Sequence, residues 1–128
     1  MPNPYNKQII DEFRAGRGRA GLILLTTRGA RTGAQHTTPL ACRPYESGIV
    51  VIASAAGAPK NPDWFHNVLA DPRVRVEDGT RSYDAVATPL AGADRDRAFA
   101  EAAADDPGWA DYQAKTPRII PVVVLTPA

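Results

Sequence analysis

The stretch from Leu22 to Leu40, LILLTTRGARTGAQHTTPL, holds the residue types best suited to binding an anion. An apolar run of strand character leads into residues 28–33, RGARTG, and a second strand-like run spans Thr37 to Ala41. The two glycines can adopt positive φ, so that backbone N–H groups point into one concavity. Two arginines, Thr32 and His36 add side-chain donors for an anionic oxygen. The pattern predicts a phosphate-binding loop, although an ordinary hairpin with solvated arginines has the same spacing.

A second candidate segment, residues 52–57, IASAAG, lies where a predicted strand ends. A serine nucleophile elbow would read G-x-S-x-G, which this segment does not. Its small side chains would let a flat ring system lie close to the backbone, with the Ser54 hydroxyl as a donor. A tight loop with a satisfied hydroxyl is the alternative interpretation.

Two aromatic clusters complete the candidate residues. Trp64 and Asn67 share one face of a short helix that follows Asn61-Pro62, and burial in the core is the ordinary role of such a tryptophan. Trp109 and Tyr112 are i, i+3 neighbours after Pro107-Gly108. This spacing predicts either a movable aromatic lid over a pocket or a surface helix packed on the fold.

In their order along the chain, TTRGARTG, TPL, VIASAAG, NPDWFHN, DPRVRVE and DYQAKTPRIIPVVVL resemble the deazaflavin-dependent nitroreductase and quinone reductase family. The opening NPYNKQIIDEFRAGRGRAG is also similar, so the resemblance covers nearly the whole chain. It implies a split antiparallel β-barrel with flanking helices, like the FMN-binding barrels. It also implies hydride transfer from reduced 8-hydroxy-5-deazaflavin, coenzyme F-420, to a quinone, a nitro-aromatic or an activated alkene.

The resemblance implies a role for each candidate segment. Arg31, Thr32 and the loop N–H groups would hold the cofactor phosphate, and Trp109 and Tyr112 would contact the electron acceptor. Tyr112 or Ser54 would be the catalytic donor, with water as the alternative proton source. The cofactor-binding residues that it implies are Arg31, Thr32, Gly33, His36, Pro39, Ala53, Ser54, Ala55, Gly57, Lys60, Asn61, Trp64 and Asn67.

The chain departs from the family pattern at several of these positions. Ala30 replaces one residue of an Arg or Lys pair, and His36 stands where many members have a basic residue, so we expect phosphate binding to be weaker or pH-sensitive. Ala55 replaces a lysine often found beside the serine. Trp109 and Asp106 replace aromatic residues that are often tyrosine. The identity of the electron acceptor is therefore the family property that transfers least well to this chain.

Three alternatives remain beside this interpretation. The barrel could bind FMN instead, which is the less favoured cofactor, or it could carry the deazaflavin without turnover. A nucleic-acid module is suggested by the N-terminal arginines, but the exposed aromatics of a stacking platform are missing, so no nucleic-acid partner is expected. His36 and His66 have no carboxylate or cysteine partners at ligand spacing, so we predict no metal site.

Composition sets the remaining expectations. A chain of 128 residues predicts one domain over residues 1–128, with a helix over 1–16 and the split barrel with its helices over 20–128. The net charge is +1, but residues 1–43 hold seven lysines and arginines and two acidic residues, which suits an anionic ligand. One cysteine, Cys42, and no signal-like segment favour the cytoplasm. Nothing in the sequence indicates membrane contact, and both monomer and homodimer remain open.

The order of predicted elements favours an antiparallel barrel with helices outside it. Asn3-Pro4 begins a helix that ends near Gly16, and Tyr45 to Gly48 forms a turn. Asp78-Gly79 predicts a tight hairpin. The predicted strands are 21–27, 37–44, 48–54, 73–77, 80–88 and 122–125, and the other predicted helices are 63–70, 93–104 and 109–115.

Overall fold

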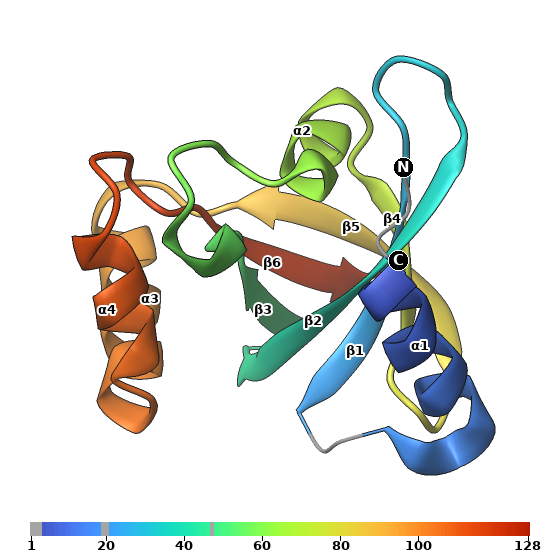
Figure 1. The fold of residues 1–128 in the computed structure, drawn as a ribbon. Helices are drawn as coiled ribbons and strands as arrows, with labels where there is room; N and C mark the ends of the chain where they lie inside the picture. The colour runs from blue at the N-terminus through green and yellow to red at the C-terminus, as the bar shows by residue number, and fades with distance from the viewer. Residues whose placement is uncertain (1–3, 19–20, 47) are drawn as a thin grey trace.

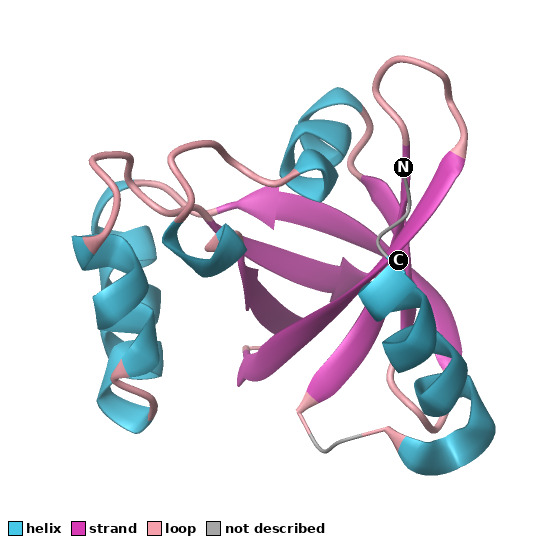
Figure 2. Cartoon of the chain, in the orientation of Figure 1, coloured by secondary structure: helices cyan, strands magenta, loops and turns pink. Residues whose placement is uncertain are grey.

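Six antiparallel strands form a closed barrel in the computed structural model, which describes residues 4–18, 21–46 and 48–128 (Figures 1 and 2). Around the barrel the order is β1 (Leu22–Arg28), β2 (Gln35–Tyr45), β3 (Gly48–Ile52), β6 (Val122–Pro127), β5 (Ser82–Pro89) and β4 (Arg73–Glu77). The antiparallel barrel predicted from the sequence is therefore confirmed.

The barrel is closed by a short pairing between β1 and β4. Leu24 to Thr26 lie opposite Glu77 to Arg75, which is three residue pairs, whereas β1 and β2 pair over seven. Beyond Thr26 the end of β1 continues with β2 alone into the loop at residues 29–34. The predicted anion loop therefore extends beyond the closed part of the barrel (Figure 1).

In the described part of the chain, four α-helices lie outside the barrel. α1 (Pro4–Glu12) continues into a π-helical turn (Phe13–Arg17) and lies against β2, while α2 (Asp63–Ala70) lies over the end of the barrel near the β1–β2 loop (Figure 1). α3 (Gly92–Asp105) and α4 (Gly108–Ala114) lie together on the other side, beyond β3 and β6.

Two apolar clusters hold these layers together. The first fills the barrel with alternate side chains of the strands, and Trp64, Phe65 and Val68 of α2 pack into it. The second covers the outer faces of β3 and β6, where Val50, Ile52, Val122 and Val124 meet Ala98, Phe99 and Ala102 of α3. Because β3 and β6 are buried on both faces, successive residues of these strands have to be apolar, and their sequences are continuous apolar runs.

The predicted boundaries hold within a few residues. The helix at 63–70 and the strand at 73–77 match the structure, and Asp78 Oδ1 accepts hydrogen bonds from the Thr80 and Arg81 N–H groups at 2.9 Å, which lowers the pKa of that carboxyl. The strand predicted to reach residue 54 ends at Ile52, because the chain turns there into a short 3-10 helix. The predicted cap at Asn3 and part of the turn at residues 45–48, at Ser47, lie outside the described residues.

Candidate functional site

A groove of about 1190 Å³ opens between α1, α2 and the β1–β2 loop, and the first residues of β2 also line it. It gathers five residues that the sequence singled out, from two separate segments of the chain: Arg31, Thr32, His36, Trp64 and Asn67. α1 supplies the third wall through Asn6, Lys7 and Ile10, which no sequence motif indicated. The loop, the aromatic helix and the N-terminal helix thus form one site.

The loop at residues 29–34 leaves donors free for an anion. The Gly29 N–H donates to the Ala34 carbonyl at 2.7 Å, and the Gly33 N–H donates to the Gly29 carbonyl at 2.9 Å. The Thr32 hydroxyl accepts from the Ala34 N–H at 3.2 Å. Among the described residues, the N–H groups of Arg31 and Thr32 have no acceptor and the Arg31 guanidinium has no acidic partner. Two successive N–H groups and one cation are the donor set that a phosphate prefers.

Asn67 fixes this loop to α2. Its side chain is 7% exposed, its Oδ1 accepts from the Ala30 N–H at 3.0 Å, and its Nδ2 donates to Thr27 Oγ1 at 3.1 Å. Both polar ends of the amide are therefore used within the chain. Asn67 lines the groove, as the sequence predicted for a pocket wall, and its hydrogen bonds also hold the anion loop in place.

The two loop glycines have different roles. Gly33 adopts φ 74°, as expected, but Gly29 is not among the residues with positive φ. A Cβ on Gly29 would lie 3.0 Å from His36 Nε2, so the absence of a side chain lets the imidazole lie against the loop. The expectation of positive φ at both glycines was therefore wrong at Gly29, where close approach is the constraint.

The segment after β3 has a strained backbone. Ala55 and Ala56 adopt φ values of 46° and 55°, and Gly57 follows at 80°. Left-handed conformations cost an L-residue roughly 1–2 kcal/mol each, so neighbouring contacts must hold this turn. A Cβ on Gly57 would lie 3.0 Å from the Tyr112 carbonyl and from Lys115 Cβ, which shows how closely the turn packs on α4.

Arg118 holds the strained segment from the other side. Its Nε donates to the Ala58 carbonyl at 2.9 Å, its Nη1 to the Ala53 carbonyl at 3.2 Å and to Asn61 Oδ1 at 2.7 Å, and its Nη2 to the Ser54 carbonyl at 2.6 Å. Burial lowers the pKa of this guanidinium. No sequence motif indicated this role of Arg118, because main-chain acceptors leave no signal in a sequence.

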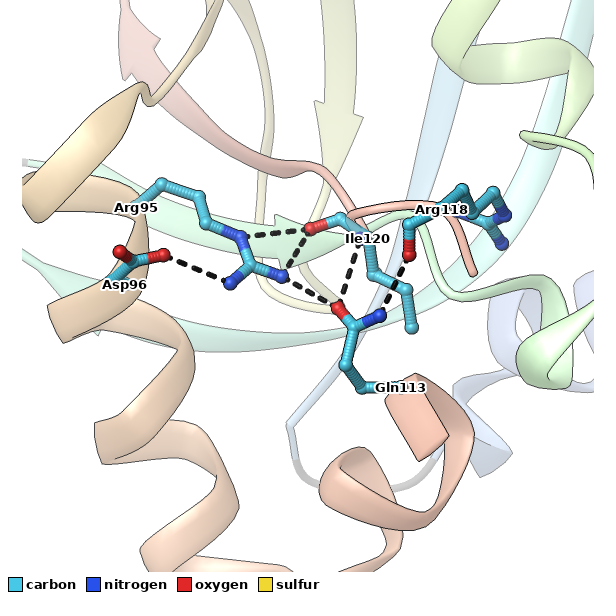
Figure 3. A network of polar contacts seen from close by, with 5 residues as sticks. All are labelled: Arg95, Asp96, Gln113, Arg118 and Ile120. Carbon is cyan, nitrogen blue, oxygen red and sulfur yellow. Dashed lines mark hydrogen bonds and ion pairs between the residues drawn. The ribbon is translucent and has the colours of Figure 1, made fainter. Parts of the chain in front are cut away.

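A polar network fixes the segment that carries Arg118 (Figure 3). Gln113 Nε2 donates to the Arg118 carbonyl at 2.7 Å, while Gln113 Oε1 accepts from the Ile120 N–H at 3.0 Å and from Arg95 Nη2 at 2.9 Å. Arg95 also donates twice to the Ile120 carbonyl. The Arg118 guanidinium points away from this network (Figure 3), toward residues 53–61.

Trp109 and Tyr112 pack against the second apolar cluster, with their ring centroids 6.0 Å apart and nearly perpendicular. This placement favours the packed-helix interpretation over the lid. Among the described residues, neither ring lines the groove, and the Tyr112 hydroxyl has no hydrogen-bond partner. Ser54 is 9% exposed, and its hydroxyl likewise has no partner in the described part of the chain.

The remaining predicted cofactor-binding residues, Gly33, Pro39, Ala53, Ser54, Ala55, Gly57, Lys60 and Asn61, do not line this groove. Pro39 of β2 pairs with Leu24 of β1, Ala53 is buried in the barrel cluster, Asn61 contacts Arg118, and Lys60 is exposed. Within the described ranges, no three His, Cys, Asp or Glu side chains gather as potential metal ligands. No helix in that part of the chain is long and apolar enough to cross a membrane.

Comparisons with known proteins agree on one family. The model of the family described as "F420H(2)-dependent quinone reductase" matches residues 7–127. An F420H(2)-dependent quinone reductase of Mycobacterium tuberculosis is 33% identical over 125 residues, covering 89% of this chain and 84% of the relative. The solved structure of an F420-H2 dependent reductase, FDR-A, has a TM-score of 0.73 and 37% identity, and covers 82% of this chain and 93% of its own. A solved chain described as a domain-swapped dimer has a TM-score of 0.75 and 32% identity, covering 96% and 99%.

Proposed function

The chain belongs to the F420H(2)-dependent quinone reductase family, and on this premise we propose which of its residues hold the reduced deazaflavin and which act on the quinone. Members of this family use reduced coenzyme F-420 as reductant. The activity of the protein is therefore quinone reduction by hydride transfer. The assignment of residues to that reaction is the proposal.

The groove fits an elongated anionic cofactor with a flat ring system. One end presents the free N–H groups of Arg31 and Thr32 beside the Arg31 guanidinium, and the side at the start of α2 is lined by Pro62 and by the 4% of Trp64 that its packing in the barrel cluster leaves exposed. Phosphate prefers the first environment and an aromatic ring the second. This juxtaposition in one groove is the observation that carries the proposal.

Arg31, Thr32 and the loop N–H groups bind the phosphate in this proposal, and Asn67 orients them. When bound, reduced coenzyme F-420 supplies the hydride, and the protein supplies placement and a water-poor surface. Quinone reduction also needs a proton. We assign that proton to the hydroxyl of Tyr112 or Ser54, on the two segments that pack together at Gly57. Neither hydroxyl lines the groove, so this assignment requires the reacting end of the cofactor and the quinone to extend from the groove to that turn.

Cofactor choice tests the proposal first. The purified protein should bind coenzyme F-420 at micromolar concentration or tighter, and FMN at least about tenfold more weakly, a difference of about 1.4 kcal/mol. Quenching of tryptophan fluorescence, from Trp64 and Trp109 together, and cofactor absorbance report both titrations. Equal or tighter binding of FMN would favour the flavin-barrel alternative. Cofactor binding without reduction of any quinone, nitro-aromatic or activated alkene would favour a carrier.

The anion loop gives a second test. Arg31→Ala should weaken binding of coenzyme F-420 by about 1.5–3 kcal/mol, or about 10- to 150-fold, because a charge-assisted hydrogen bond to the phosphate is lost. Binding by the wild-type protein should also weaken as salt rises. Arg28→Ala is the matched control, because Arg28 is exposed on the same hairpin but lines a different surface. Equal affinities of the Arg31 and Arg28 variants would make the loop an ordinary hairpin.

Assembly and location are further proposals. Since a homologous chain is described as a domain-swapped dimer, we propose a homodimer or a monomer, which light scattering distinguishes. A single cysteine supports a reducing, cytoplasmic setting.

A further inference from the structure

Both histidines of the chain line the same groove, although 30 positions separate them in sequence. His36 comes from β2, and its ring lies against Gly29 of the anion loop. His66 comes from α2, is exposed, and has its ring edge-on to Phe65 with centroids 6.2 Å apart. Neither the motifs nor the packing of the core explains an exposed imidazole on this wall.

The fixed charge of the groove is small. The other charged side chains that line it are Lys7 of α1, Arg31 of the loop and Asp63 of α2. Lys7 Nζ forms an ion pair with Asp11 Oδ2 at 3.1 Å. Two cations, one of them paired, thus face one carboxylate. Protonation of His36 and His66 would add two positive charges, so the electrostatic character of the groove depends mainly on these imidazoles.

We propose that His66, together with His36, completes the binding site for the anionic part of the cofactor, and that binding takes up protons at these two imidazoles. The inference rests on the proposed function. A protonated imidazole carries a positive charge and donates from both ring nitrogens, whereas the neutral ring donates from one. An anion in the groove therefore favours the protonated rings, and by linkage its affinity rises as pH falls.

The experiment compares wild-type protein with His36→Gln, His66→Gln and the double variant. The double variant contains no histidine, since the chain has two. Glutamine retains one donor and one acceptor but does not titrate. Titrations with oxidised coenzyme F-420 at constant ionic strength, from about pH 8 to about pH 6, give the affinities. Calorimetry in two buffers of different ionisation enthalpy gives the protons taken up.

As the pH falls from about 8 to about 6, we expect the affinity of wild-type protein for the cofactor to rise about tenfold more than that of the double variant. Each single variant should show part of this additional rise. Proton uptake on binding should be larger with wild-type protein than with the double variant. Ionisation of the cofactor itself is common to all four proteins and cancels in the comparison. Tight binding with the same pH dependence and proton uptake in wild-type and double-variant protein would overturn this inference alone. Absence of binding at every pH would overturn the proposed function as well.

Discussion

Arg118→Ala should lower the free energy of unfolding by about 2–4 kcal/mol, because the Ala53 and Ala58 carbonyls and the Asn61 amide oxygen lose their donor and the Ser54 carbonyl keeps only the Gly57 N–H. The strained conformations at Ala55 and Ala56 then lose the contacts that oppose relaxation. Urea unfolding measures the loss. Arg118→Lys should recover little of it, since one ammonium cannot donate in the four directions of the guanidinium fork.

Arg97→Ala is the matched control for Arg118. Arg97 is exposed and reaches Asp94 at 3.7 Å on the same helix, so its removal should change stability by less than about 0.5 kcal/mol. If the Arg118 and Arg97 variants unfold alike, Arg118 does not hold the segment. The Arg118→Ala variant should also reduce quinone more slowly than wild-type protein. We expect this loss at temperatures well below the unfolding temperature of the variant, because the turn at Ser54 is no longer fixed.

Tyr112→Phe should reduce the turnover of quinone by about tenfold to a thousandfold if its hydroxyl stabilises charge that develops on the acceptor. The ring contact with Trp109 and the burial against the second cluster are retained. Since the hydroxyl has no partner in the described residues, stability should change by less than about 0.5 kcal/mol. Affinity for coenzyme F-420 should stay nearly unchanged, because the anion loop lies in the groove, away from this ring.

Oxidation of the reduced deazaflavin by menadione, followed as absorbance returns, gives the turnover of wild-type and variant protein. Tyr45→Phe is the control, because Tyr45 packs against the same cluster at the end of β2. Turnover by Tyr112→Phe equal to that of wild-type protein would remove Tyr112 from the chemistry. Ser54→Ala would then distinguish the serine hydroxyl from water as the proton source.

Local patterns were enough to predict most of the fold. The helix at 63–70 follows Asn61-Pro62, and Asp78-Gly79 specifies the β4–β5 hairpin. Such signals depend on neighbours in sequence. The hydrogen bonds of Arg118 do not, because their main-chain carbonyl acceptors lie 60 to 65 positions away and every residue type has such a carbonyl.

The site was predicted in part for the same reason. Donor-rich and aromatic segments identified Arg31, Thr32, His36, Trp64 and Asn67, which the structure brings to one groove. The wall formed by α1 and the presence of His66 depend on long-range packing, so no spacing rule indicated them. Conversely, the i, i+3 spacing of Trp109 and Tyr112 fits a lid and a packed helix equally, and only the contacts with the second cluster distinguish the two.

A crystal structure of the protein with coenzyme F-420 bound is the most direct test of the groove as the cofactor site. We predict the cofactor phosphate against the Arg31 and Thr32 N–H groups and the Arg31 guanidinium, with the remainder of the molecule along the α2 wall at Trp64. Cofactor density elsewhere on the barrel, with the Arg31 side chain in solvent and the groove free of cofactor, would contradict this account.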